Sequence, residues 1–276
     1  MGVLDSFKPN DELRFKDDGS YRIRDDEFVI NGKPYCKKCG EPRFFEATKF
    51  GYPNFKVGCM CACQVRVDRE NELLKIRQEN ERKFKEDQRL SVIGKNIDKT
   101  FDDYITDKEN EDLVHRLQAY CKNSEMALSR NVGFYISGES RVGKTMLTSI
   151  MCNELVKKGY SCLFTSISRL LAEIQSGWSG IGVKEPEILR KVESVDFLFL
   201  DDFGTELIGK ERKVGGTFEE NKTFAIIDAR SRSGKPLIIT SNYSIEQLQT
   251  KYNIDERIIK RINEMSTRKV VLKRTN

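Results

Sequence analysis

A phosphate-binding pattern occupies residues 138–145, which read GESRVGKT and match G-x-x-x-x-G-K-[ST] in full. Its glycines let the backbone curl so that N–H groups point at phosphate oxygens, and the following helix adds its dipole. Lys144 would reach the β- and γ-phosphates, while the hydroxyl of Thr145 would ligate Mg²⁺. The sequence therefore predicts ATP and Mg²⁺ as ligands, with nucleotide contacts from Gly138, Ser140, Val142, Gly143, Lys144, Thr145 and Met146.

A pair of carboxylates directly follows the apolar run Phe197–Leu200. Because that strand end lies beside the loop in a phosphate-loop sheet, Asp201 is predicted to hold Mg²⁺. Asp202 is predicted to orient the attacking water as general base. An Asp-Asp pair alone is more typical of a turn, but the apolar run before it and the phosphate loop upstream favour the catalytic interpretation.

Two further groups of polar residues follow. The apolar run Leu237–Thr240 ends in Ser241 and Asn242, and the Asn242 amide is predicted to lie near the γ-phosphate, although it also suits a helix cap. Arg257 and Arg261 are one helical turn apart, so one of them could complete the ATP site of a neighbouring copy as an arginine finger. Their spacing fits two solvated arginines on a surface helix equally well.

Cysteines are concentrated near the N-terminus. Of the eight in the chain, five fall between residues 36 and 63, namely Cys36, Cys39, Cys59, Cys61 and Cys63. Cys36-x-x-Cys39 is a standard zinc hook, and the later cysteines offer the second pair of a tetrahedral four-thiolate site. Free thiols are the alternative, and the paired spacing disfavours it. The sequence predicts one structural Zn²⁺, with five thiols for four positions.

Three sections must position these residues. Residues 1–64 hold the cysteine cluster, and residues 65–95 are dense in charge and predict an exposed connecting helix. Residues 96–276 alternate short apolar runs with amphipathic helices, which predicts an α/β fold with a parallel sheet and flanking helices. The expected strands are residues 132–136, 162–165, 197–200 and 237–240, and helices are expected after Thr145, after Ser168 and from about residue 218.

The composition sets limits on partners and location. The net charge of +5 and the pI near 8.7 permit a nucleic-acid partner without requiring one. No run approaches the ~18 apolar residues of a membrane span, and the first residues lack the apolar core of a secretory signal. We therefore expect a cytoplasmic protein without a membrane partner.

The combined motifs resemble the DnaC/DnaI helicase loaders. The resemblance is carried by Gly138–Thr145, Phe197–Gly204, Lys235–Asn242 and Glu256–Ile262, and it covers residues from about 96 to 270. It implies an AAA+ P-loop domain that binds ATP and single-stranded DNA and delivers a replicative DnaB-type helicase. It also implies ATP-dependent self-association. The Walker B pair that the resemblance identifies, Asp201 and Asp202, reads Asp-Asp where many AAA+ proteins have Asp-Glu, so slow hydrolysis is expected.

The same resemblance assigns roles to individual residues. Lys144 and Thr145 look like the Walker A pair, and Asn242 looks like the sensor. Arg261 looks like the arginine finger, with Arg257 as second choice. The segment Ser166–Ser176, with Arg169, resembles the helical stretch that this branch of AAA+ proteins turns toward DNA. In the cysteine module, related phage proteins end in Cys-x-Cys, which favours Cys61 and Cys63 as ligands beside Cys36 and Cys39, with Cys59 as a possible replacement. The module itself would dock the helicase.

Three other functions remain open from the sequence. A transposition-helper ATPase of the IstB type shares the AAA+ core, but the cysteine-rich front end argues against it. A DnaA-like nucleotide-regulated DNA-binding protein would need a DNA-reading domain after the last motif. The Asp-Asp ending also leaves room for a module that holds ATP without turnover.

Overall fold

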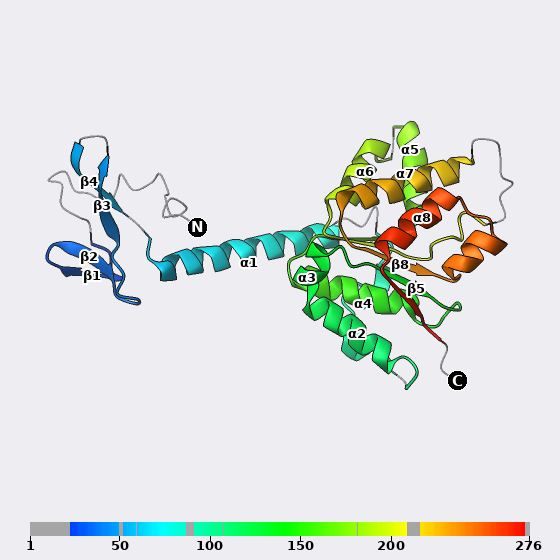
Figure 1. The fold of residues 1–276 in the computed structure, drawn as a ribbon, viewed down its shortest axis with the longest axis horizontal. Helices are drawn as coiled ribbons and strands as arrows, with labels where there is room; N and C mark the ends of the chain where they lie inside the picture. Colours follow the sequence, from blue (N-terminus) through cyan, green and yellow to red (C-terminus); the bar gives the residue numbers. More distant parts are fainter. Residues whose placement is uncertain are drawn as a thin grey trace. The chain divides into compact units, whose positions relative to one another are not determined.

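The computed structural model describes residues 23–49, 52–58, 60–86, 91–106, 108–180, 182–208 and 216–273 (Figure 1). The chain divides into two compact units, Met1–Lys75 and Ile76–Asn276. The division falls within the long helix α1, which spans Ala62–Glu86 and belongs to both units. Among the described residues, every helix is too short or too polar to cross a membrane.

The first unit is built from two antiparallel hairpins. Strand β1 (Glu27–Ile30) pairs with β2 (Lys33–Cys36), and β3 (Phe44–Lys49) pairs with β4 (Tyr52–Gly58). Asn31 and Gly32 connect β1 to β2 with φ angles of +51° and +75°. Two consecutive positive φ angles are typical of the tight Asn-Gly turn that joins antiparallel strands. This hairpin places Cys36 at the end of β2.

The second unit is organised by a five-stranded sheet in the order β6-β7-β8-β5-β9. All neighbouring strands in it are parallel. Their bounds are β5 Phe134–Ser137, β6 Cys162–Thr165, β7 Phe197–Leu200, β8 Leu237–Ser241 and β9 Arg268–Val271. The predicted α/β class is confirmed, and the first four strands lie where the apolar runs indicated. The edge strand β9, RKVV, had no such run and went unpredicted.

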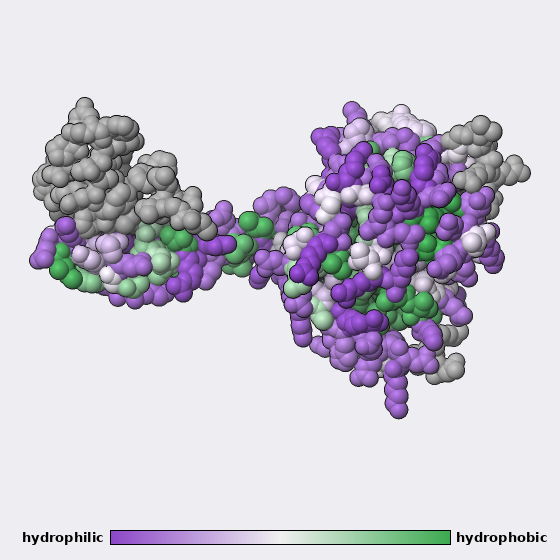
Figure 2. All heavy atoms as spheres, viewed as in Figure 1, coloured by the Kyte–Doolittle hydropathy of each residue, from purple (hydrophilic) through white to green (hydrophobic). Residues whose placement is uncertain are grey.

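Helices cover both faces of this sheet (Figure 1). They are α2 Glu111–Lys122, α3 Ser124–Ser129, α4 Lys144–Lys157, α5 Ile167–Trp178, α6 Glu185–Ser194, α7 Phe218–Ser233 and α8 Glu256–Met265. Because side chains alternate along a strand, Leu198 and Leu200 join the core beneath α5, α6, α7 and α8, while Phe197 and Phe199 join the core beneath α2 and α4. Shorter helical turns are η3 Gly94–Asn96, η4 Phe101–Asp103 and η5 Gln247–Lys251. Figure 2 shows that hydrophilic residues cover most of the visible surface of this unit.

A buried arginine ties α7 to the sheet. Arg230 is fully buried and donates hydrogen bonds to backbone carbonyls of Val192, Val195, Asp196 and Pro236. Burial lowers the pKa of Arg230 to about 10, so the guanidinium stays charged at neutral pH. These carbonyls come from the end of α6 and the approaches to β7 and β8, so one side chain joins three elements.

We expect Arg230→Leu to cost at least about 3 kcal/mol of unfolding free energy, because it leaves several buried carbonyls without a donor. Urea unfolding of the full chain measures the loss. Arg232→Leu is the matched control on the same helix, since the Arg232 side chain is 65% exposed and its ion pairs are with the carboxylates of Glu193 and Asp228. Equal losses in the two variants would contradict the structural role of Arg230.

Candidate functional site

The predicted phosphate loop joins the carboxyl end of β5 to the first turn of α4. Gly143 precedes α4 with φ +94°, in the left-handed region that favours glycine. Gly138 is required for another reason, because a Cβ there would lie 2.2 Å from the carbonyl oxygen of Leu272. The two glycines therefore shape a loop at a helix N-terminus, which is the geometry that accepts a phosphate group.

The Lys144 side chain lies along the inside of this loop. Its Nζ donates to the carbonyl oxygens of Gly138 at 2.9 Å and Glu139 at 2.7 Å, and to Oδ1 of Asn242 at 2.8 Å. Burial lowers the pKa of Lys144, and the nearby carboxylates of Asp202 and Asp201 oppose that shift. A cation held between the loop and the end of β8 is suited to countering phosphate charge.

The ends of β7 and β8 bring the predicted carboxylates to the loop. Thr145 Oγ1 lies 3.0 Å from both carboxylate oxygens of Asp201, and Thr240 Oγ1 lies 2.6 Å from Asp201 Oδ1. Burial raises the pKa of Asp201, while its hydrogen bonds to Thr240 and Thr145 lower it. Hydroxyl and carboxylate oxygens are the ligands that Mg²⁺ prefers, so Thr145 and Asp201 fit this ion.

Asp202 points its carboxylate toward the end of β8. Its backbone has φ +53°, and its Oδ1 accepts a hydrogen bond of 2.7 Å from Asn242 Nδ2. Asn242 therefore contacts both Asp202 and Lys144. The structure thus brings together Lys144, Thr145, Asp201, Asp202 and Asn242, which the sequence had placed in three separate segments.

The other loop residues contribute in different ways. Ser140 is exposed, while Val142 and Met146 are partly buried and pack against the core beneath α4. Val142 and Met146 have no polar side-chain atom free to bind phosphate, so only their backbone N–H groups could meet a nucleotide. Their predicted contacts remain predictions.

Both candidate arginine fingers lie on α8 and are held by acids of the same chain. Arg261 donates to Asp228 and to Glu264, each at 3.1 Å. Arg257 binds Asp255 through Nε and Nη2 and lies over the ring of Phe224. Neither arginine contacts the phosphate loop in the described part of the chain. This placement is compatible with action on a neighbouring copy, which remains a prediction.

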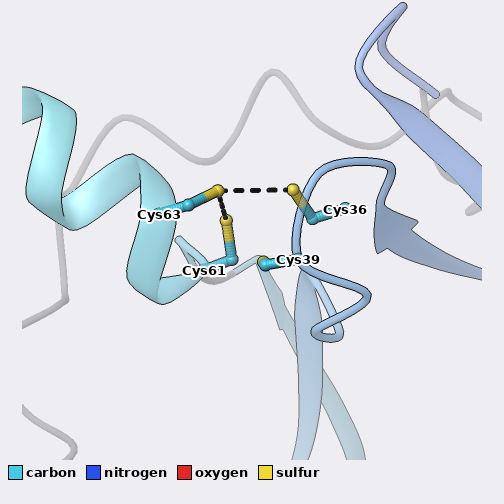
Figure 3. A group of neighbouring side chains, drawn as sticks. All are labelled: Cys36, Cys39, Cys61 and Cys63. Atoms are coloured by element: carbon cyan, nitrogen blue, oxygen red, sulfur yellow. Dashed lines mark hydrogen bonds between the residues drawn. The ribbon is translucent and has the colours of Figure 1, made fainter.

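The cysteine cluster forms a compact group (Figure 3). The sulfur atoms of Cys36, Cys39, Cys61 and Cys63 all lie within 4.8 Å of one another, contributed by the end of β2, the turn after it and the start of α1. Thiolates around a tetrahedral Zn²⁺ are about 3.8 Å apart, because each Zn–S bond measures about 2.3 Å. The residues therefore fit zinc. Cys59, the alternative ligand, lies outside the described residues.

The surroundings of this cluster shift the pKa values of its thiols in opposite directions. Hydrogen bonds, chiefly from the N–H of Cys39, lower the pKa of Cys36 to about 6, whereas the Cys61 side chain and burial raise the pKa of Cys63 to about 12. The thiolate is the form that binds a metal. Arg43 is buried, with Nη2 3.6 Å from Cys36 Sγ and 2.6 Å from Asp26 Oδ2. Burial lowers the pKa of Arg43, but the charges of Cys61, Cys36 and Asp26 outweigh burial and raise it.

The predicted DNA segment is the helix α5, capped by Ser166, whose hydroxyl accepts from the N–H of Arg169. The Arg169 side chain is 41% exposed and lies 3.4 Å from Glu173. Trp178 at the end of α5, which the sequence analysis did not single out, is 68% exposed and meets the ring of Phe218 edge-on. An exposed tryptophan is uncommon, and as the chain's only one it was a signal that could have been used.

The chain is similar in sequence to curated proteins. The chain is 29% identical over 129 residues to the replicative helicase loader DnaC of Escherichia coli K12, covering 47% of this chain and 49% of the relative. It is 26% identical over 127 residues to the replicative helicase loader DnaI of Bacillus subtilis, covering 45% and 38%. The chain thus spans half or less of the length of these curated relatives.

Similarity also extends to solved structures and to a family. The crystal structure of the DnaC helicase loader matches with a TM-score of 0.52 at 21% identity, covering 66% of this chain and 99% of that one, so the fold is shared. AMPPCP-bound DnaA from Aquifex aeolicus matches with a TM-score of 0.51 at 21% identity, covering 66% and 51%. The family described as IstB-like ATP binding protein matches residues 63–265. The chain therefore belongs to the family of IstB-like ATP binding proteins.

Proposed function

We propose that this protein binds ATP with Mg²⁺, hydrolyses it slowly, and loads a DnaB-type replicative helicase onto single-stranded DNA. One observation carries the proposal, namely the hydrogen-bonded group of Lys144, Thr145, Asp201, Asp202 and Asn242 at one edge of the sheet. The similarity to proteins named replicative helicase loaders supports the choice of partner.

Each residue of this group has a part in nucleotide turnover. Lys144 counters charge on the β- and γ-phosphates, and Thr145 and Asp201 hold Mg²⁺, which neutralises phosphate charge when bound. Asp202 takes the proton of the attacking water, and Asn242 orients the carboxylate that does so. An aspartate is one methylene shorter than the glutamate usual at this position, so its reach toward the water is reduced and hydrolysis is slow.

Arg261 would connect nucleotide to assembly. Its side chain is 39% exposed and held in place by Asp228 and Glu264, so a charged group is presented at the surface of α8. An arginine supplied by one copy to the ATP of the next stabilises charge on the transferred phosphoryl group. ATP would therefore favour self-association of several copies.

Single-stranded DNA would lie along α5. Arg169 offers a cation for phosphate, and Trp178 offers an exposed aromatic face on which a base can stack. Single contacts of this kind are weak, so repeated copies are needed to bind a strand. DNA binding should therefore depend on ATP and weaken as salt rises.

The cysteine module would dock the helicase. Residues 1–64 contain the thiol cluster, and the charged linker of residues 65–95 contains most of α1. A zinc-held unit that is separate from the ATPase core suits a docking role, because it can bind a partner without disturbing the nucleotide site.

The experiment measures helicase capture and DNA binding for the full chain, a variant lacking residues 1–64, and Arg261→Ala. The truncated protein should lose helicase capture and keep most of its DNA binding. Arg261→Ala should lose ATP-dependent binding of single-stranded DNA while each copy still binds nucleotide. Arg232→Ala is the matched control, because Arg232 shares Asp228 with Arg261 but lies on α7.

A transposition-helper ATPase is the second candidate, favoured by the match to the IstB-like family. Such a protein would prefer double-stranded DNA. A preference for duplex over single strands, or helicase capture by the truncated chain, would contradict the loader proposal and favour this alternative.

A further inference from the structure

A threonine near the end of β8 contacts both aspartates of the candidate site. Thr240 is buried, with 2% of its surface exposed, and its Oγ1 lies 2.6 Å from Asp201 Oδ1. The same oxygen accepts a hydrogen bond of 3.0 Å from the backbone N–H of Asp202. Because an ionised carboxylate can only accept, the hydroxyl hydrogen of Thr240 must point at Asp201. The direction of both bonds is therefore determined.

The backbone of Asp202 needs such an anchor. Its φ of +53° places a non-glycine residue in the left-handed region, which costs on the order of 1 kcal/mol. The bond from Asp202 N–H to Thr240 holds this conformation, and in it the carboxylate meets Asn242 Nδ2 at 2.7 Å. Two side chains at the end of β8 thus hold Asp202. Thr240 binds its backbone N–H, and Asn242 binds its carboxylate.

Asp201 is held from the opposite side by α4. Thr145 Oγ1 lies 3.0 Å from each of its carboxylate oxygens, whereas Thr240 contacts Oδ1 alone. A donor fixed on Oδ1 sets the rotation of the carboxylate, while Thr145 Oγ1 stays equally close to both of its oxygens. The orientation of the Asp201 carboxylate, the proposed Mg²⁺ ligand at the end of β7, therefore depends on the hydroxyl of Thr240 on β8.

We propose that Thr240 is the positioning residue of the nucleotide site, where one hydroxyl orients the Mg²⁺-binding carboxylate of Asp201 and the left-handed backbone of Asp202 together. This inference rests on the proposed ATPase function. Thr240 touches neither nucleotide nor metal in this role. It couples the end of β8, which carries Asn242, to the end of β7, which carries both carboxylates.

The test compares Thr240→Val with Thr240→Ser in the full chain. Valine keeps the shape of threonine without the hydroxyl, and serine keeps the hydroxyl. Valine should raise the Mg²⁺ concentration for half-maximal ATP hydrolysis and lower kcat, each by about tenfold, the worth of one hydrogen bond to a charged group. Serine should restore both values to within about twofold of wild type, since the hydroxyl that makes both bonds is retained.

Two measurements separate positioning from general damage. Affinity for a fluorescent ATP analogue in EDTA should match wild type in Thr240→Val, because Lys144 and the loop are intact. Thr165→Val is the matched control, since Thr165 is a fully buried threonine at the end of β6 whose hydroxyl bonds only the carbonyl of Ser166, at 3.4 Å. It should leave the Mg²⁺ dependence unchanged.

Several outcomes would overturn the inference. They are an unchanged Mg²⁺ dependence in Thr240→Val, equal damage in Thr240→Ser, or an equal shift in Thr165→Val. If Thr240→Val does not fold, Thr240→Ala is measured in its place against Thr240→Ser. If wild-type protein hydrolyses no ATP with helicase and single-stranded DNA present, the proposed function fails. In that case the increase in affinity for the fluorescent ATP analogue when Mg²⁺ is added, compared between wild type and Thr240→Val, still decides whether Thr240 acts on Asp201.

Discussion

Replacing Lys144 with alanine is expected to lower the affinity for ATP by about 100-fold, which corresponds to ~3 kcal/mol. The ammonium group lies within hydrogen-bond distance of the loop carbonyls and of Asn242, where it would meet the β- and γ-phosphates. Alanine removes that positive charge and leaves the glycine-shaped loop in place. Titration of a fluorescent ATP analogue, followed by anisotropy in the presence of Mg²⁺, measures the change.

Asp202→Asn is the companion variant. It keeps the size of the side chain and removes its ability to take a proton, so ATP should bind as in wild type while hydrolysis slows by about 100-fold or more. Unchanged ATP affinity in Lys144→Ala would contradict the assignment of residues 138–145 as the phosphate-binding loop. Unchanged hydrolysis in Asp202→Asn would show that another group is the base.

Removal of zinc is expected to unfold the cysteine module and leave the nucleotide site intact. The purified chain should carry one Zn²⁺ per copy, bound by the thiolates that lie within 4.8 Å of one another. Structural zinc sites in small modules supply about 10 kcal/mol or more, so a unit built on two short hairpins loses its main source of stability without the ion. Elemental analysis gives the zinc content, and hydrogen exchange after chelation locates the loss of protection.

Single cysteine variants sharpen this result. Cys39→Ser should lower the zinc content and loosen residues 23–75, whereas Cys59→Ser should keep the metal. Protection of residues 134–241 should not change in either variant. Protein purified without chelators that contains no zinc would refute the site. Loss of zinc in the single variant Cys59→Ser would show that Cys59 is a ligand in place of one of the four assigned cysteines.

Much of the nucleotide site was readable from the sequence because its parts are local. Gly138–Thr145 is a continuous segment with a known geometry, and Asp201 and Asn242 each follow a buried apolar run. Since parallel strands end at the same edge of a sheet, these segments had to converge. The structure brings them into direct hydrogen-bond contact, as in the bond from Lys144 to Asn242 and the bond from Asn242 to Asp202. The α/β class followed from the same alternation of apolar runs and amphipathic helices.

The tertiary structure decided what local patterns do not encode. The strand β9 is mostly exposed and begins with two basic residues, so only its pairing with β5 reveals it. The spacing of five cysteines allowed more than one ligand set, and among the described residues the hairpin turn and the start of α1 bring Cys36, Cys39, Cys61 and Cys63 together.

The same holds for side chains whose partners lie far along the chain. Arg230 reads as an ordinary surface arginine, yet its guanidinium meets carbonyls 34 to 38 residues away. Thr240 reads as one more β-branched strand residue, and its hydroxyl meets Asp201 only because β7 and β8 are neighbours. Residue type and spacing determined which groups do chemistry, while the order of strands in the sheet determined which hydrogen bonds orient them, because strand order is set by packing of the whole core.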